Sequence, residues 1–152
     1  MAMDTETTLP GTALTVEQLL PDVTFTDAAT GDKWQPSQLR QRSALALCFL
    51  HRDCEPCEQF LADLAERENT IDWADAQVRV VLPESASLPF PVLLDPRGEA
   101  RARMLGEDGE LPTVLVADRY TSVVQSFPAP DHDFPDVAGV VKTLFLLACD
   151  CE

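Results

Sequence analysis

The sequence predicts a mixed α/β domain with a central mixed β-sheet and helices on both faces. Short apolar runs typical of buried strands alternate with segments whose apolar residues recur every three or four positions, as in amphipathic helices. With 152 residues, 45% of them hydrophobic, the chain is long enough to bury one core. No internal repeat or long linker interrupts the pattern. We therefore expect a flexible lead-in over residues 1–14 and a single domain over residues 15–152.

The charge of the chain disfavours some classes of partner. Twenty-six acidic and eleven basic residues give a formal charge of −15, whereas phosphate binding needs a basic face. The acidic N-terminus has no basic and apolar regions of a secretory signal, and the apolar stretch Val137–Ala148 contains Lys142 and is too short to span a bilayer. We expect no nucleic-acid partner, no membrane association and a cytoplasmic location, in which the five cysteines are reduced, catalytic or metal-binding.

The first half of the domain is expected to contain a hairpin, a strand and a helix. Val23–Thr26 alternates apolar and polar residues, and a Thr-Gly-Asp turn separates it from Trp34, which indicates an N-terminal β-hairpin extension. Ala44–Leu50 is an uninterrupted apolar run and predicts a strand buried on both faces. A helix with an apolar stripe follows it and should fade near Asn69.

The second half continues the alternation of strands and helices. Expected strands cover Val78–Leu82, Pro89–Asp95, Thr113–Ala117 and Ser122–Phe127, and expected helices cover Gly98–Leu105 and the region from Val137 to Ala148. The prolines around Pro89–Asp95 suit an edge strand or a strand start. We expect both tryptophans, Trp34 and Trp73, to be packing residues.

Cys54 and Cys57 lie where the central strand gives way to the helix. Pro56 suits the first helical turn, and the unpaired N–H groups and positive dipole end there stabilise a thiolate, which brings cysteine pKa values down to about 3.5–7.5 in some proteins. The acidic neighbours Glu55 and Glu58 act in the opposite direction. The spacing predicts a redox dithiol, and it is also compatible with half of a zinc site or with inert thiols.

Three further cysteines have different interpretations. Cys48 lies in the middle of the apolar run and is expected to be a small buried hydrophobe. Cys149 and Cys151 are either exposed thiols, an auxiliary redox pair that exchanges electrons with Cys54 and Cys57, or part of a zinc site formed by these four thiolates.

The order of these elements resembles the thioredoxin fold, and the chain is most similar to peroxiredoxin-like redoxins of the AhpC/TSA type that carry a Cys-x-x-Cys motif. The likeness covers most of the chain from about residue 14 onward. It is carried by the following stretches: Val23–Trp34, Phe49–Cys57, Pro91–Asp95 and Leu111–Asp118.

The resemblance implies roles for several residues. Cys54 would be the exposed attacking thiol and Cys57 the more buried resolving thiol. Pro112 would be cis and lie against the dithiol, and the backbone of Leu111 would be offered to an incoming peptide. Arg52 would help to hold a peroxide oxygen.

The chain departs from both subfamilies. Thioredoxins carry a buried Asp six residues before the first cysteine, where this chain has Cys48, and an aromatic residue directly before it, where this chain has Asp53. Peroxiredoxins use Pro-x-x-x-Thr-x-x-Cys, whose Pro and Thr positions are Leu50 and Cys54 here. The missing acid argues against the efficiency of a thioredoxin-like reductase, and the missing Pro and Thr argue against a peroxidase. A thiol-disulfide oxidoreductase is the leading interpretation, and a peroxiredoxin-like peroxidase is the alternative.

The expected partners are protein or small-molecule disulfides, or peroxides, together with a cellular dithiol reductant. No cofactor and no bound metal are expected for this activity. A thioredoxin-fold module without enzymatic activity, or a four-cysteine zinc site, is the alternative from a different class of function.

Overall fold

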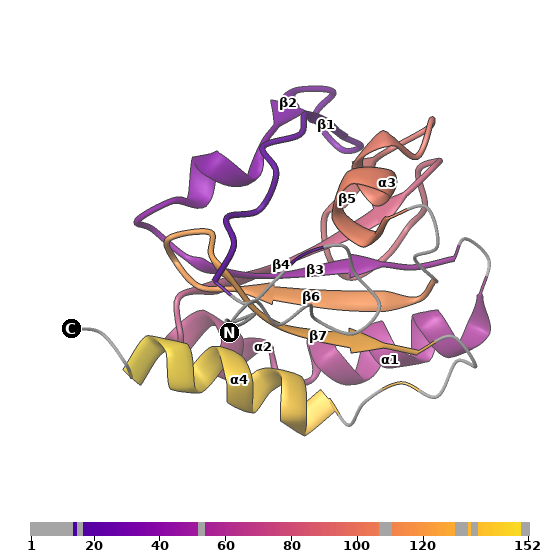
Figure 1. Ribbon diagram of the computed structural model, residues 1–152. Helices are drawn as coiled ribbons and strands as arrows, with labels where there is room; N and C mark the ends of the chain where they lie inside the picture. Colours follow the sequence, from indigo (N-terminus) through magenta and orange to yellow (C-terminus); the bar gives the residue numbers. More distant parts are fainter. Residues whose placement is uncertain are drawn as a thin grey trace, which may run out of the picture.

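The computed structural model describes residues 14, 17–51, 54–106, 111–129, 134 and 137–149, with backbone only for the last two residues. Within them, one seven-stranded sheet has the order β2-β1-β5-β4-β3-β6-β7 (Figure 1). The strands are β1 (Phe25–Asp27), β2 (Lys33–Trp34), β3 (Ala44–Phe49), β4 (Ala76–Leu82), β5 (Val92–Leu94), β6 (Thr113–Ala117) and β7 (Val123–Pro128). The helices are α1 (Glu55–Ala65), α2 (Glu68–Trp73), α3 (Glu99–Leu105) and α4 (Val137–Cys149), with a 3₁₀ turn, η1, at Pro36–Leu39.

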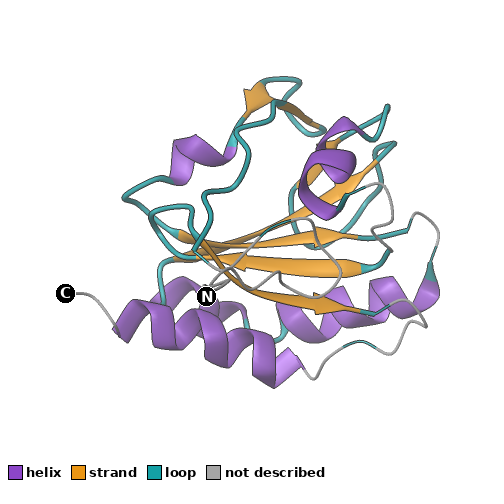
Figure 2. Ribbon diagram, viewed as in Figure 1, coloured by secondary structure: helices purple, strands orange, loops and turns teal. Residues whose placement is uncertain are grey.

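The helices lie on both faces of the sheet, as the sequence predicted. Figures 1 and 2 show α1, α2 and α4 along one face and α3 with the N-terminal hairpin on the other side. Each face has its own apolar core, one formed mainly with α1 and α4 and one with α3 and the hairpin. None of the described helices has the length and apolar character needed to cross a membrane.

Strand β3 is central because it has a partner on each side and apolar side chains on both faces. It pairs in parallel with β4 and antiparallel with β6. Successive side chains of a strand point to opposite faces, and the two cores divide the strand accordingly. The alternate residues Ala44, Ala46 and Cys48 belong to the core with α1 and α4, and Leu45, Leu47 and Phe49 belong to the other core.

The N-terminal hairpin is present and extends the sheet. Its strands pair antiparallel with Phe25 opposite Trp34, and Trp34 is only 6% exposed. Strand β1 also pairs antiparallel with β5, with Thr26 opposite Leu94. Strand β5 is therefore an interior strand and not an edge strand, because the hairpin pairs with its outer side. The other alternative for these prolines, a strand start, is confirmed, since β5 begins directly after Pro91.

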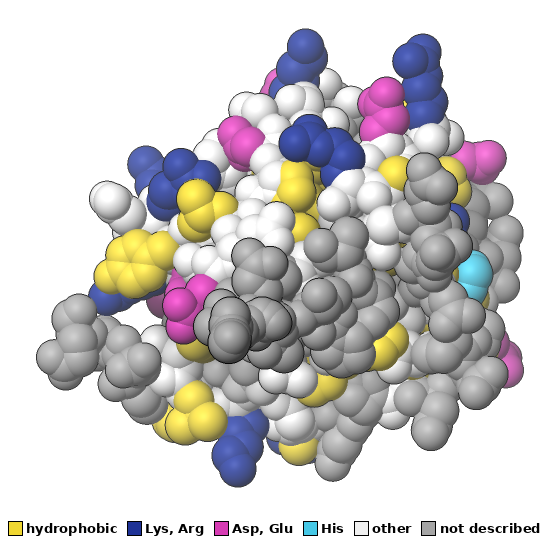
Figure 3. Space-filling view, in the orientation of Figure 1, with side chains coloured by type: hydrophobic (Ala, Val, Ile, Leu, Met, Phe, Trp, Pro, Cys, Tyr) yellow, Lys and Arg dark blue, Asp and Glu magenta, His cyan; other side chains and the backbone are white. Residues whose placement is uncertain are grey.

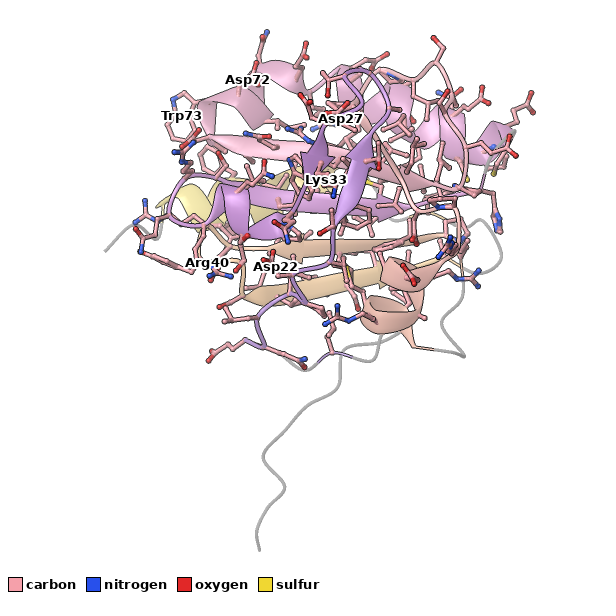
Figure 4. All side chains as sticks on the ribbon, turned by 90° about the horizontal axis from the view of Figure 1, so that it is seen from above. Asp22, Asp27, Lys33, Arg40, Asp72 and Trp73 are labelled. Carbon is pink, nitrogen blue, oxygen red and sulfur yellow. The ribbon has the colours of Figure 1, made fainter. Side chains whose placement is uncertain are left out.

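The region after α1 also differs from the prediction. The helix expected to fade near Asn69 is two helices, since α1 ends at Ala65 and α2 starts at Glu68. Ile71 is the buried residue of α2. The prediction for Trp73 was wrong, because its side chain is 66% exposed and lies at the rim of the molecule (Figure 4). Its ring stacks on that of Phe145 with a centroid distance of 4.9 Å. The predicted division at residues 14 and 15 stays a prediction, although Leu14 itself is buried in the core with α3.

Candidate active site at the start of helix α1

Cys54 is the N-cap residue of α1. Its backbone is extended (φ −114°, ψ 112°), and its Sγ accepts a hydrogen bond from the backbone N–H of Cys57 at 3.3 Å. Pro56 occupies the first helical turn, where an N–H would have no partner in the helix. The sequence Cys-Glu-Pro-Cys therefore starts the helix and holds both thiols in its first turn.

The two thiols differ in burial. Cys54 is 9% exposed and Cys57 is 1% exposed, so Cys57 is the more buried of the two, as expected. Cys54 is nevertheless less exposed than the resemblance implied. Cys48 is fully buried in the same core and lies near enough to Cys57 for their charges to interact. A third thiol thus lies beneath the pair, at the position where thioredoxins carry an acid.

Both inner thiols resist ionisation. Burial is the main cause that raises the pKa of Cys57 to about 12, and the hydrogen bond and charge of Cys54 and the charge of Glu58 add to it. A backbone hydrogen bond from His51 acts in the opposite direction. Burial also raises the pKa of Cys48 to about 12. The helix start was expected to favour a thiolate, but for Cys57 the loss of water outweighs that effect.

Leu111 and Pro112 lie beside the end of β3. The peptide bond between them is cis, as expected, and the next residue, Thr113, pairs with Phe49 in the sheet. The carbonyl oxygen of Pro112 accepts the N–H of Ala129 at 2.8 Å. Within the described part of the chain, the backbone of Leu111 makes no hydrogen bond, which leaves its N–H and C=O open to an extended ligand.

Two pockets open at this end of the sheet, and Leu50 and Leu82 line both. The first has a volume of about 240 Å³ and reaches Cys57, with His51 and Glu58 at its wall. The second has a volume of about 290 Å³ and reaches Leu111. Neither was predicted as a cavity, and apart from Leu111 the residues named at the wall of the second pocket had no predicted site role.

The second pocket carries the charged residues that sequence reasoning missed. Its wall includes Asp95, Arg97 and Arg101. The carboxylate of Asp95 accepts the backbone N–H groups of Ala100 at 3.2 Å and Arg101 at 3.1 Å, so it caps α3. The available signal was the concentration of arginines at positions 97, 101 and 103 in an otherwise acidic chain.

Other predicted site residues cannot be compared with the dithiol. Arg52 and Cys151 lie outside the described residues, as does the side chain of Cys149. Figure 1 shows the C-terminal end of α4 at the opposite end of the molecule from the start of α1. The auxiliary redox role of Cys149 and Cys151 stays a prediction. Among the described residues, no three His, Cys, Asp or Glu side chains are grouped so that they could hold a metal ion.

Comparison with known proteins supports the fold. No protein-family model and no curated protein sequence matches the chain. Among solved structures, peroxiredoxin 6 of Arenicola marina is similar with a TM-score of 0.72 at 12% identity, over 87% of this chain and 72% of that protein. A secreted thiol-disulfide isomerase from Corynebacterium glutamicum has a TM-score of 0.71 at 18% identity, over 86% of each chain.

A third solved structure is similar to the chain to a comparable degree. The peroxidoxin BcpB from Mycobacterium tuberculosis has a TM-score of 0.70 at 17% identity, over 90% of this chain and 98% of that protein. The chain therefore has the thioredoxin-like fold found in peroxiredoxins and thiol-disulfide isomerases, as the resemblance implied.

Proposed function

We propose that the protein is a thiol-disulfide oxidoreductase whose reacting groups are Cys54 and Cys57. The observation that carries the proposal is the pairing of the two thiols in the first turn of α1, with the outer one as helix cap and the inner one 1% exposed. Leu111 and Pro112 lie at the same end of the sheet, and the open backbone of Leu111 supports a role in substrate binding.

The reaction transfers two electrons from the dithiol to a substrate disulfide. The thiolate of Cys54 attacks one substrate sulfur, the substrate S–S bond breaks, and one half leaves as a thiolate. Cys57 then loses its proton and attacks the sulfur of Cys54, which releases the second half of the substrate. The products are a Cys54–Cys57 disulfide and two substrate thiols, and a cellular dithiol reverses the oxidation.

The first step prepares the second. In the reduced protein, the hydrogen bond and the charge of Cys54 both raise the pKa of Cys57. Once the sulfur of Cys54 is bound covalently to the substrate, it is no longer a thiolate that accepts a hydrogen bond from the Cys57 thiol and repels its charge, so both effects disappear. Burial and Glu58 still raise the pKa of Cys57 and the backbone hydrogen bond of His51 still lowers it, so the pKa of Cys57 falls when the mixed disulfide forms. The inner thiol is thus kept protonated until it is needed.

The experiment is oxidation of the reduced protein followed by alkylation and intact mass measurement. With bis(2-hydroxyethyl) disulfide, wild type should form an intramolecular disulfide. Cys57→Ser should stop at a mixed disulfide, with a protein mass increased by one half of the substrate. Cys54→Ser should form neither the intramolecular disulfide nor the mixed disulfide. Cys48→Ala is the matched control, because it removes a buried cysteine and should leave the reaction intact. If Cys54→Ser reacts as fast as wild type, the proposal is wrong.

A peroxiredoxin-like peroxidase is the second candidate, because the fold is shared with peroxiredoxins. In that reaction a thiolate takes an oxygen atom from the peroxide and becomes a sulfenic acid, and the second thiol condenses with it, releasing water. Replacing the disulfide by hydrogen peroxide in the same experiment separates the two activities. Faster oxidation by the peroxide would favour the peroxidase.

A zinc-binding module is tested separately by metal analysis. Protein purified without chelator is compared with Cys54→Ser and with a Cys149→Ser and Cys151→Ser double variant. Stoichiometric zinc that is lost in both variants would contradict a freely cycling dithiol and identify a structural metal site.

A further inference from the structure

We infer that the pocket between β3, β4 and α3 binds the carboxylate-bearing half of a small disulfide substrate. This inference rests on the proposed exchange reaction and adds the substrate class. We call the cavity of about 290 Å³ beside Leu111 the arginine pocket. Its position, its lining and its charge each support this assignment.

The position links the arginine pocket to the reacting thiols. Leu111 lies at its wall, and the open backbone of this residue directly precedes the cis proline. Leu50, at the end of the strand that leads to Cys54, lines the arginine pocket and also the pocket that reaches Cys57. A disulfide placed along Leu111 with one sulfur toward Cys54 therefore directs its far half into the arginine pocket.

The lining combines an apolar floor with cationic walls. Phe49, Val81 and Leu82 are each at most 4% exposed and form the apolar part. Arg97 and Arg101 are the cationic part. A guanidinium presents several N–H donors in a plane that matches a carboxylate, so this combination suits an aliphatic chain that ends in a carboxylate.

The charge of the arginine pocket is opposite to that of the whole chain. Among the described residues of its wall, Arg97 and Arg101 are cationic and Asp95 is anionic, and the carboxylate of Asp95 accepts two backbone N–H groups of α3. The guanidinium of Arg97 has no hydrogen-bond or ion-pair partner among the described residues. Figure 3 shows Lys and Arg side chains, with Asp and Glu side chains among them, projecting from the upper part of the molecule, around the hairpin and α3. On a protein of charge −15, a recess that carries two arginines at the end of β3 attracts anions to the end of the sheet where α1 begins.

The volume argues for a small substrate. Ligand pockets usually measure about 300–1,000 Å³, and 290 Å³ lies at the lower limit of that range. It accommodates one half of a low-molecular-weight disulfide and not a folded protein segment. The reaction itself is unchanged: two thiols of the protein are oxidised, and the substrate disulfide is reduced to two thiols.

The experiment compares two disulfides of similar size and different charge. 3,3′-Dithiodipropionate carries two carboxylates, and bis(2-hydroxyethyl) disulfide is neutral. Each oxidises the reduced protein under pseudo-first-order conditions at low ionic strength, and the Cys54–Cys57 disulfide is followed by quenching, alkylation and mass measurement. The ratio of the two rate constants, compared between variants, cancels the intrinsic reactivity of the two probes.

The variants separate the arginine pocket from the general charge of α3. Arg97→Gln with Arg101→Gln should lower the rate constant for the dicarboxylate by about five- to twentyfold and leave the neutral probe unchanged. Arg103→Gln is the matched control, since Arg103 lies on the same helix, is exposed, and is not part of the pocket wall. It should leave both rate constants within about twofold of wild type. The unchanged rate with the neutral probe also shows that the double variant is folded.

Each outcome decides one question. If the double variant keeps the wild-type ratio, or if Arg103→Gln lowers the ratio equally, the arginine pocket is not the carboxylate site, while the proposed function stands. If wild type and Cys54→Ser react equally slowly with both probes, the proposed function fails, and the inference fails with it.

Discussion

The buried thiol of Cys48 predicts a specific loss of stability at alkaline pH. Its pKa is raised from 9.0 to about 12 by burial in the core beneath the dithiol. The folded protein therefore holds this proton more tightly than the unfolded chain does. Stability from this group is fully present below pH 9.0, where both states are protonated, and it is lost as the pH rises from 9.0 toward 12.

The magnitude follows from the raised pKa. At a pH one unit above the ordinary cysteine pKa of 9.0, the thiol of Cys48 is ionised in the unfolded chain and protonated in the folded protein. This difference favours unfolding by about 1.4 kcal/mol. Cys48→Ala abolishes this contribution. At neutral pH the variant should be about 1 kcal/mol less stable than wild type, because it removes buried sulfur. Near pH 10 the difference should disappear or reverse, because only wild type suffers the ionisation penalty.

The assay is urea unfolding of the fully reduced proteins over a series of alkaline pH values. Val114→Ala is the matched control, since Val114 lies opposite Cys48 on β6, is fully buried and does not titrate. The difference between the free energies of unfolding of Val114→Ala and wild type should not change with pH. If the free energies of unfolding of wild type and Cys48→Ala differ by the same amount at every alkaline pH, burial does not hold the thiol in the protonated form, and the reasoning is refuted.

Three further predictions concern the helices. Asp95→Ala removes the acceptor of two backbone N–H groups of α3 and should cost about 1–2 kcal/mol in urea unfolding, most of which Asp95→Asn should restore; equal losses in both would contradict the capping role. A double-mutant cycle of Trp73→Ala and Phe145→Ala should give a coupling of about 0.5–1.5 kcal/mol from the ring stack, and additive losses would show that the rings do not interact. Glu58→Gln removes a charge that raises the pKa of Cys57, so resolution of the mixed disulfide near pH 7 should accelerate about 1.5- to fivefold, and a slower reaction would contradict this direction.

The central part of the fold was predictable because its signals are local. The apolar run that becomes β3 is long enough to identify a strand buried on both faces, and the Cys-Glu-Pro-Cys sequence marks the helix start that follows it. The cis bond before Pro112 was expected from the resemblance and not from composition. In these places, one short stretch of sequence determines the structure.

The remaining features depend on residues far apart in the chain. Strand β5 becomes interior only because the hairpin, more than sixty residues earlier, pairs with it. Helix α2 is short and mostly polar, so its sequence has little apolar periodicity, and only Ile71 is buried. The arginine pocket is formed by the ends of β3 and β4, the start of α3 and Leu111, and no local pattern joins these segments. The raised pKa of Cys57 likewise depends on burial that spacing alone does not reveal.

The placement of the two tryptophans provides separate optical probes for two parts of the molecule. Trp34 lies in the hairpin, 6% exposed, with its ring 6.0 Å from that of Phe25 and 5.7 Å from the guanidinium of Arg79. Trp73 lies on α2 at the rim of the molecule, where Figure 4 shows it pointing outward. In Trp73→Phe, fluorescence would report only on the seating of the hairpin against the sheet. In Trp34→Phe, it would report only on the surface of α2 and α4. Emission changes in the two variants can therefore distinguish release of the N-terminal extension from unfolding of the whole domain.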